Sequence, residues 1–245
     1  MKLLVDLGNT RLKWATETQG QISSVTAMDY RQPGFLQNIN QLWQALPPPD
    51  VVGIAAVGNR LLQQDLLQLS RQLWPQAKQV LPKSTQAAFG VKNAYAQPEK
   101  LGIDRWLALI AAHHIYPGFT CVVDCGTAIT IDVLTFDGVH RGGVIVPGLR
   151  LMQQALATNT ADLEFNQQAH QIALAQHTDA GIANGVLAAA VGSIETICQK
   201  LDGEFQLLMT GGDADVIASA LSIPSTIDAE LVLKGLSVYC QADNK

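Results

Sequence analysis

The chain has 245 residues, of which 48% are hydrophobic, and a formal net charge of -5 at pH 7. This length can bury a substantial core in one large domain or in two of ordinary size, so size alone demands neither metals nor disulfides. The acidic balance and the absence of long Lys/Arg runs argue against a nucleic-acid partner, and they favour a small-molecule partner instead.

The cysteines and the N-terminus indicate the compartment in which the chain works. Cys121, Cys125, Cys198 and Cys240 are scattered without a C-x-x-C pair, a spacing that suits neither a zinc site nor a disulfide framework. The few apolar residues before Asp6 fall short of a signal peptide, and no apolar run approaches the ~18 residues of a membrane span. The sequence therefore predicts a soluble cytoplasmic protein with no membrane partner.

The first half of the chain is expected to begin with three strands and to continue with alternating helices and strands. The three strands are predicted at 2–5, 12–16 and 22–26, later strands at 51–57 and 78–81, and helices at 36–46, 61–74 and 104–115. The prolines at 47–49 should end the first helix, because proline lacks the backbone donor and restricts the residue before it. Residues 84–101, rich in Gly, Pro, Asn and Gln, predict a long irregular segment and a candidate binding element.

The second half repeats the order of the first. Strands are predicted up to Val123, at 130–134 and at 139–146, then a helix led by Pro147, a helix at 183–201, a strand ending at Thr210, and helices at 216–221 and 236–239. Three strands followed by helices, twice over, indicate an internal duplication. We therefore expect two halves, 1–117 and 118–245, with the boundary near Pro117 and Gly118.

Both halves carry the same turn after their first strand, as D-L-G-N-T-R-L-K from Asp6 and as D-C-G-T-A from Asp124. A carboxylate at a strand end, a glycine that admits close backbone approach, and Asn or Thr side chains together suit a phosphate-facing turn. Lys13 can add an ammonium charge to the same phosphates. Either turn alone could be an ordinary hairpin with a turn aspartate. Their recurrence in both halves favours phosphate binding.

This pattern resembles the actin, sugar kinase and Hsp70 superfamily. The resemblance implies an α/β fold of two duplicated ribonuclease H-like (actin-like ATPase) domains with a nucleotide cleft between them. Residues 210–213, T-G-G-D, resemble the glycine turn of that superfamily at a helix N-terminus, although alone they form a common strand-to-helix turn.

Within the superfamily the chain resembles the type III pantothenate kinases over nearly its full length. Besides the two aspartate turns, the resemblance rests on Y-A-Q-P-E-K-L-G-I-D-R from Tyr95, on G-G-V-I-V-P-G-L-R-L-M from Gly142 and on H-T-D-A-G-I-A-N-G from His177. The L-G-x-D-R element belongs to this family rather than to the whole superfamily. The implied activity is ATP-dependent phosphorylation of pantothenate to 4'-phosphopantothenate, the first step of coenzyme A biosynthesis.

Residues 102–105 also have a physical interpretation of their own. Gly102 permits close backbone approach, Asp104 stands where a helix begins, and Arg105 can form a forked hydrogen bond with a carboxylate or hydroxyl-rich ligand. Without the resemblance, Asp104 could merely cap that helix.

The resemblance assigns roles to particular positions. It implies that Asp104 is the base that receives the hydroxyl proton, that ATP arrives with Mg²⁺, and that Asp124 binds a monovalent cation, K⁺ or NH4⁺. The implied ATP-binding residues are Asp6, Gly8, Asn9, Thr10, Arg11, Lys13 and Thr127. The implied pantothenate-binding residues are Tyr95, Gly102, Ile103, Asp104, Arg105 and Thr178.

Other interpretations remain open at this point. A kinase of the same superfamily could act on another small alcohol. The chain could also be a non-catalytic regulatory accessory factor, because the family includes proteins first described as accessory factors for virulence gene expression. The presence of Asp104 and Lys13 favours catalysis. Family members are homodimers, and the helix A-N-G-V-L-A-A-A-V-G-S-I-E-T-I could bury against a partner or inside one subunit.

Overall fold

The structure, a computed structural model, describes residues 1–158 and 171–242, and the chain forms two compact units. Unit 1 comprises Met1–Ile115 together with the C-terminal stretch from Glu230, and unit 2 comprises Tyr116–Ala229. The sequence predicted two halves that meet at residue 117, with the C-terminal helix in the second. The structure differs there, because this helix packs against helix and strands of unit 1.

Unit 1 is built on a six-stranded sheet in the order β3-β2-β1-β5-β6, with β4 also paired to β2. β1, β2 and β4 form antiparallel pairs, whereas β5 and β6 run parallel to β1. The predicted third strand at 22–26 is in fact two short strands, β3 and β4. The strands are β1 (Lys2–Leu7), β2 (Arg11–Thr18), β3 (Gln21–Ile22), β4 (Thr26–Asp29), β5 (Val51–Ala56) and β6 (Lys78–Val80).

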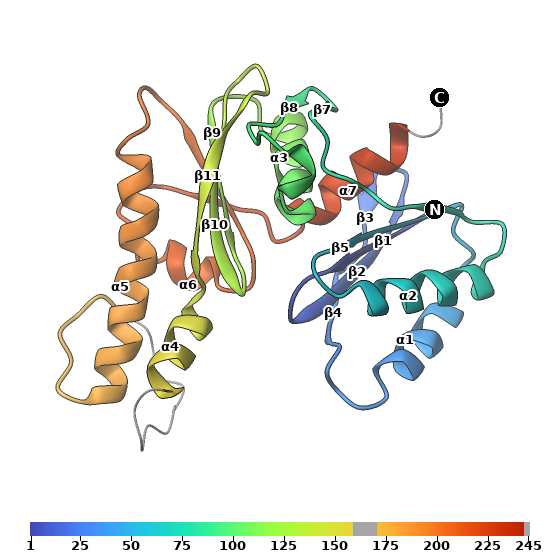
Figure 1. Ribbon diagram of the computed structural model, residues 1–245, viewed down its shortest axis with the longest axis horizontal. Helices are drawn as coiled ribbons and strands as arrows, with labels where there is room; N and C mark the ends of the chain where they lie inside the picture. The colour runs from blue at the N-terminus through green and yellow to red at the C-terminus, as the bar shows by residue number, and fades with distance from the viewer. Residues whose placement is uncertain (159–170, 243–245) are drawn as a thin grey trace. The chain divides into compact units, whose positions relative to one another are not determined.

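One face of this sheet is covered by α1 (Phe35–Gln44) and α2 (Arg60–Leu73), which lie side by side (Figure 1). Their buried side chains form one core with alternate residues of β1 and β2. α1 ends at Gln44, just before the prolines, as expected. Asn59 caps α2, because its side chain accepts a hydrogen bond from the backbone N–H of Leu62 at 3.1 Å.

The opposite face of the same sheet receives α7 (Leu231–Ala242), which also packs against α3 (Ile103–Ile115). In Figure 1 these helices appear as red and green ribbons beside the blue strands. Two glycines allow the contacts. A Cβ at Gly53 of β5 would lie 2.6 Å from the Cys240 sulfur, and one at Gly235 would lie 1.9 Å from the Leu107 carbonyl oxygen. Both helices therefore approach their neighbours at distances that only glycine allows.

Unit 2 repeats the sheet of unit 1 in the order β11-β10-β9-β12-β13. β9, β10 and β11 are antiparallel neighbours, and β12 and β13 run parallel to β9, so this sheet has the same topology as the order β4-β2-β1-β5-β6. The duplication predicted from the sequence is present in the strand order. The strands are β9 (Thr120–Cys125), β10 (Ala128–Leu134), β11 (His140–Pro147), β12 (Gln206–Thr210) and β13 (Thr226–Ile227).

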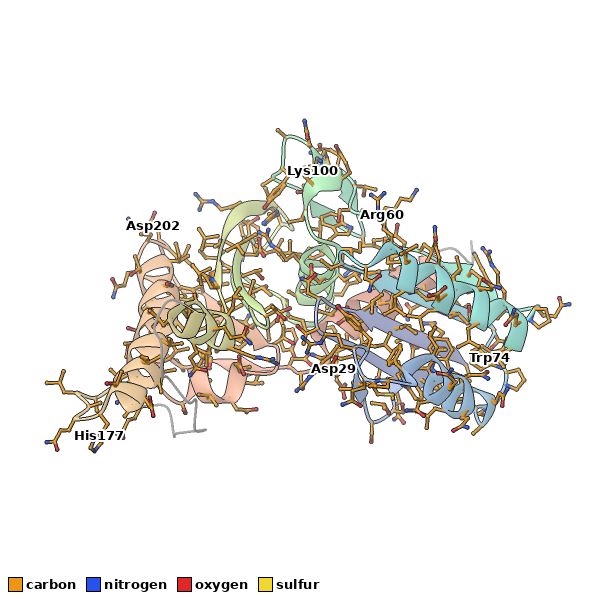
Figure 2. The ribbon with its side chains drawn as sticks, turned by 60° about the horizontal axis from the view of Figure 1, so that its bottom comes forward. Asp29, Arg60, Trp74, Lys100, His177 and Asp202 are labelled. Carbon is orange, nitrogen blue, oxygen red and sulfur yellow. The ribbon has the colours of Figure 1, made fainter. Side chains whose placement is uncertain are left out.

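The core of unit 2 lies between its sheet and the helices α4 (Leu149–Thr158), α5 (Thr178–Cys198) and α6 (Ala214–Ala218). α5 begins five residues before the predicted start at 183, because the glycines of its first turns are accommodated in the helix. Figure 2 shows His177 and Asp202 near the two ends of this helix.

α5 is the one helix in the described part of the chain that is long and apolar enough to cross a membrane by length and composition. The core helix of a soluble protein meets the same criterion, so the finding is weak evidence for a membrane span. Over the most apolar stretch of α5, 44% of the residues are buried within this chain.

Candidate active site

The first predicted phosphate turn connects β1 to β2 in unit 1. Asp6 and Lys13 are directly opposite each other in the antiparallel pair, so their side chains project from the same face of the sheet. The neighbours of Asp6 along the strand, Val5 and Leu7, belong to the core under α1 and α2. The carboxylate and the ammonium therefore project from the face opposite to that core.

The turn itself is closed by its own backbone and by one neighbouring side chain. The N–H of Gly8 donates to the carbonyl of Arg11 at 3.1 Å, and the hydroxyl of Tyr30 donates to the carbonyl of Asn9. Asn9 and Arg11 are exposed, and Thr10 is partly buried. These residues can present backbone and side-chain donors to an anion, and their role in phosphate binding stays a prediction.

The second turn, between β9 and β10 in unit 2, has the same design with one residue fewer. Asp124 lies opposite Thr130, at the register position that Lys13 occupies relative to Asp6. Its neighbours Val123 and Cys125 belong to the core of unit 2, so the Asp124 carboxylate also projects from the face opposite to the core. The second turn therefore repeats the carboxylate without the ammonium.

Two neighbouring segments hold the second turn in place. The N–H of Gly148 donates to the Thr127 carbonyl at 2.9 Å, and the N–H of Asp213 donates to the Cys125 carbonyl at 3.0 Å. Gly211, in the left-handed region at φ +95°, is so close that an added Cβ would lie 2.6 Å from Asp124 Oδ1. The predicted cation ligand and the glycine turn of residues 210–213 are thus in contact within unit 2.

The charge around this turn is negative. Burial, together with the nearby carboxylates of Asp124 and Asp213, raises the pKa of the Cys125 thiol well above its ordinary value. Cys125 is therefore a buried neutral thiol. A cation beside these two carboxylates would be electrostatically favourable.

The segment before α3, predicted to be irregular, is ordered by one buried asparagine. Asn93 is 5% exposed, and its side-chain amide donates to the carbonyls of Thr85 and Pro98 at 3.3 and 3.2 Å. Its side-chain oxygen accepts the N–H of Tyr95 at 3.0 Å. The segment also forms a small hairpin and a short 3₁₀ turn, β7 (Ala87–Ala88), β8 (Val91–Lys92) and η1 (Pro98–Lys100).

Asp104 lies in the first turn of α3, one residue after the start of the helix at Ile103. Its Oδ1 accepts the backbone N–H of Arg105 at 2.8 Å, which satisfies one of the donors that a helix N-terminus leaves unpaired. The helix-capping interpretation of Asp104 therefore holds in part. A Cβ at Gly102 would lie 2.6 Å from that same oxygen, so glycine is needed for the observed position of the carboxylate.

Arg105 is buried, with 6% of its surface exposed. Its Nη1 donates to the Tyr95 hydroxyl at 2.8 Å, and its guanidinium carbon lies 5.5 Å from the centre of the Tyr95 ring. The structure thus brings Tyr95, Gly102, Asp104 and Arg105 together in unit 1, although they come from two segments of the sequence. Burial of the guanidinium fixes its position before any ligand arrives.

Thr178 belongs to unit 2, where it is the first residue of α5. It is exposed and lines a groove of about 880 Å³ between α4 and α5. Apolar or small side chains form most of the groove wall, among them Leu151, Ile182 and Val186. The remaining predicted site residues of unit 2 do not line this groove: Asp124 lies near the end of β9, and Thr127 lies in the β9–β10 turn.

The donor groups of the two turns suit cations that are shared with a substrate. Within the described residues, no group of three or more His, Cys, Asp or Glu side chains could hold a metal ion by itself. Mg²⁺ in kinases is bound by one or two carboxylates together with substrate phosphates, and K⁺ is coordinated by backbone and carboxylate oxygens. The single carboxylates of Asp6 and Asp124 fit such shared coordination.

Three residues of this region were not among the individual site residues predicted from the sequence. Asn93 organises the segment that carries Tyr95, Tyr30 contacts the first turn, and Asp213 contributes its N–H to the second turn. Burial distinguishes Asn93 from ordinary polar residues, and pairing with distant parts of the chain distinguishes Tyr30 and Asp213; sequence patterns reveal neither property. Only Asp213 lay within a pattern, the T-G-G-D turn, that could have indicated its position.

Comparison with solved structures defines the class of protein. A Campylobacter jejuni protein named for the Baf family of transcriptional activators aligns with a TM-score of 0.63 and 22% identity, covering 99% of this chain and 98% of that one. The ROK hexokinase of Thermus thermophilus aligns at 0.54 and 12%, covering 99% of both chains. These likenesses, with the duplicated sheets, confirm the predicted fold: the chain has the fold of the actin-like ATPases and sugar kinases.

Sequence comparison then gives the family. The family model described as type III pantothenate kinase matches residues 2–200. A type III pantothenate kinase from Nitrosococcus oceani is 37% identical, with 100% of this chain and 96% of the relative covered. One from Halorhodospira halophila is 37% identical, with 96% of each covered. The chain belongs to the type III pantothenate kinase family, which confirms the resemblance. Neither alternative, a regulatory accessory factor or a kinase of another small alcohol, is favoured by these matches.

Proposed function

We propose that this chain transfers the terminal phosphoryl group of ATP to the primary hydroxyl of pantothenate, giving 4'-phosphopantothenate for coenzyme A biosynthesis. Family membership supports the reaction. One observation supports the assignment of this reaction to particular residues. It is the cluster of Tyr95, Gly102, Asp104 and Arg105, in which a glycine makes room for a carboxylate at a helix N-terminus.

Asp104 acts in this proposal as the base. Phosphoryl transfer passes through a loose transition state, so the protein mainly has to position the hydroxyl in line and neutralise phosphate charge. A fixed carboxylate can orient the hydroxyl early and accept its proton late. Buried Arg105, held by Tyr95, offers further donors for pantothenate, and Gly102, Ile103 and Thr178 complete the proposed substrate-binding set.

The first phosphate turn binds ATP in this proposal. Lys13 supplies a point charge beside the Asp6 carboxylate, from the face of the sheet opposite to the α1–α2 core. The backbone and side chains of the turn supply hydrogen bonds to phosphate oxygens. The proposed ATP-binding residues are Asp6, Gly8, Asn9, Thr10, Arg11, Lys13 and Thr127.

Asp124 is the proposed ligand of a monovalent cation, K⁺ or NH4⁺, and Mg²⁺ accompanies ATP. The support is electrostatic, because Asp124 and Asp213 both place negative charge beside Cys125. A large, oxygen-ligated cation adds positive charge there without a demand for strict octahedral geometry. When bound, the cations neutralise charge on the transferring phosphates.

We further propose that the protein is a cytoplasmic homodimer. All four cysteines are free thiols with buried side chains, which suits a reducing compartment. The apolar groove between α4 and α5, together with the incomplete burial of α5 inside its own chain, supports a second copy as the covering surface.

The test is a coupled assay of ADP release, with pantothenate present or absent and with K⁺ or Na⁺ as the monovalent cation. We expect ADP release to require pantothenate and to rise with K⁺. Asp104→Asn should lower kcat by about 10²- to 10⁴-fold, the usual contribution of a general base, with a smaller change in the KM for ATP. Asp124→Asn should lose the response to K⁺.

Asp65→Asn is a matched control, because Asp65 is an exposed residue of α2 outside the proposed site. It should behave like the wild type. ADP release that ignores pantothenate would contradict the proposed reaction, and an unimpaired Asp104→Asn enzyme would contradict the proposed base.

A further inference from the structure

The chain passes between its two units at two places, between Ile115 and Tyr116 and between Ala229 and Glu230. Residues beside both crossings are joined to each other. The hydroxyl of Tyr116 donates to Oδ2 of Asp228 at 2.9 Å, across 112 positions of sequence. One side-chain hydrogen bond therefore holds the two crossings side by side.

Asp228 and the residues that directly follow Tyr116 are anchored to the sheet of unit 2. The N–H of Asp228 donates to the carbonyl of Met209 at 2.8 Å, directly after β13 pairs with β12. On the other crossing, Gln206 of β12 donates its side-chain amide to the Pro117 carbonyl and its N–H to the Phe119 carbonyl, both at 2.8 Å. The same strand, β12, thus fixes both connections.

A glycine makes room for the hydrogen bond from the Gln206 side-chain amide to the Pro117 carbonyl. Gly118 is in the left-handed region at φ +133°, and a Cβ there would lie 2.8 Å from the Gln206 side-chain nitrogen. On the unit 1 side, the connections begin at the end of α3 and at the start of α7, two helices that pack closely through Gly235. Short connections between rigid elements are where hinge motion is absorbed.

The environment of the bond favours its persistence. Asp228 is 5% exposed, and a buried carboxylate is costly unless it is hydrogen-bonded. Burial of Tyr116, followed by its hydrogen bond to Asp228 and the charge of that carboxylate, raises the Tyr116 pKa to about 12. The phenol therefore remains a protonated donor throughout the neutral range.

We propose that Tyr116 and Asp228 form a hinge clasp, a pair of positioning residues that makes the two crossings bend together when the units move during the phosphoryl transfer reaction. Kinases of many folds bring domains together around their substrates, which excludes water and completes the site. With the clasp intact, the two connections share one motion. Without it, the contacts with β12 still hold Asp228 and Pro117, but Tyr116 is no longer tied to the other crossing, and the free protein samples more arrangements that do not bind substrate.

The clasp predicts a particular kinetic signature, and this prediction rests on the proposed pantothenate kinase activity. When only a fraction of molecules is competent to bind, the apparent dissociation constant rises by the inverse of that fraction. If Tyr116→Phe lowers the competent fraction to about one fifth, the KM values for ATP and pantothenate should rise about fivefold. Asp104 is untouched, so kcat at saturation should change much less. ADP release without pantothenate should increase relative to the coupled rate, because water is less well excluded.

The experiment compares full-length Tyr116→Phe with a matched control, Tyr239→Phe. The Tyr239 hydroxyl accepts the N–H of Lys83 at 3.3 Å inside unit 1, so the control loses one tyrosine hydrogen bond away from the crossings. Asp228→Asn is a second variant that keeps an oxygen acceptor for the Tyr116 hydroxyl, and it should show a smaller effect than Tyr116→Phe. Small-angle X-ray scattering with and without both substrates should show a wider range of sizes for free Tyr116→Phe than for wild type.

The outcomes separate the clasp from the reaction itself. A wild-type protein that releases no pantothenate-dependent ADP overturns the proposed function. A normal wild type together with a Tyr116→Phe variant that matches Tyr239→Phe in KM, in uncoupled ADP release and in scattering overturns the clasp. If Tyr116→Phe proves too unstable to assay, Asp228→Asn tests the clasp instead. An Asp228→Asn protein whose KM values for ATP and pantothenate do not exceed those of wild type would then overturn it.

Discussion

At the scale of single residues, a missing methyl group at Gly102 decides where the Asp104 carboxylate can lie. The Cβ of any other residue would lie 2.6 Å from Asp104 Oδ1, well inside the normal contact distance. A Cβ at Gly211 in unit 2 would also lie 2.6 Å from Asp124 Oδ1, and it would lie 2.5 Å from the Cys125 carbonyl. In each unit, a glycine therefore leaves space beside a carboxylate to which the proposed chemistry assigns a role, and at Gly211 it also leaves space for the backbone of the turn.

Gly102→Ala should impair catalysis by displacing Asp104. A displacement of about 1 Å at a reacting group costs on the order of 10²-fold in rate, so kcat should fall by roughly that factor. Steady-state kinetics measures the loss, and urea unfolding checks that the protein remains folded. In an Asp104→Asn background the same substitution should cost little more, because the group it displaces is already inactive. Fully additive losses would contradict this coupling.

The sequence indicates the proposed site residues better than it indicates the residues that hold them in place. Asp6, Lys13 and Asp124 stand in short local patterns, and local patterns can be found in a single sequence. Asn93, Tyr30 and Asp228 contribute through partners from 2 to 112 positions away and through burial. Those properties arise only when the chain has folded, so the local sequence contains no signal for them.

At the scale of secondary structure elements, the crossing of α3 and α7 depends on Gly235. A Cβ at this position would lie 1.9 Å from the backbone oxygen of Leu107, a contact that no side-chain rearrangement can relieve. The two helices would have to move apart, and this movement would also disturb the contacts of α7 with β1 and β5.

Gly235→Ala should therefore destabilise unit 1 by about 3 kcal/mol or more, at the upper end of the cost of overpacking. Urea unfolding followed by tryptophan fluorescence measures the change, since Trp106 is buried in α3. Lys234→Ala is the neighbouring control. It removes a partly exposed ion pair with Glu230, worth less than about 1 kcal/mol, and leaves the contact of Gly235 with Leu107 unchanged. Equal stability of the two variants would rule out the close crossing.

Prediction of the elements succeeded where periodicity was strong and failed where glycine or short strands interrupted it. The buried strand at 51–56 and the helix at 60–73 were expected within a residue or two. α5 starts earlier than the predicted 183. Glycine lowers helix propensity in its first turns, whereas packing on the unit 2 sheet stabilises the helix there. α7 is much longer than the predicted 236–239, since Gly235 weakens the helical pattern in the sequence but allows the close helix contact in the fold.

At the scale of the whole molecule, the proposed dimer makes the apolar groove of unit 2 a surface that is covered in solution. Leu151 lines this groove and is 43% exposed in the single chain. Leu151→Asp should place a charge in the interface and shift the protein towards monomer, because an unpaired buried charge is strongly unfavourable. Sedimentation equilibrium measures the change in mass.

Leu61→Asp is the control for that experiment, since Leu61 is 76% exposed on α2 of unit 1. It should leave the mass of the assembly unchanged. A wild type that sediments as a monomer at micromolar concentration would contradict the proposed dimer, as would a Leu151→Asp protein with undiminished mass.

The return of α7 to unit 1 affects the order in which the protein can fold during its synthesis. The strands of unit 1 leave the ribosome first, but the helix that covers one face of their sheet is the last described element of the chain. At ordinary rates of translation, the synthesis of unit 2 takes on the order of ten seconds. During that interval unit 1 is without α7, so it begins to form before unit 2 but is completed after it.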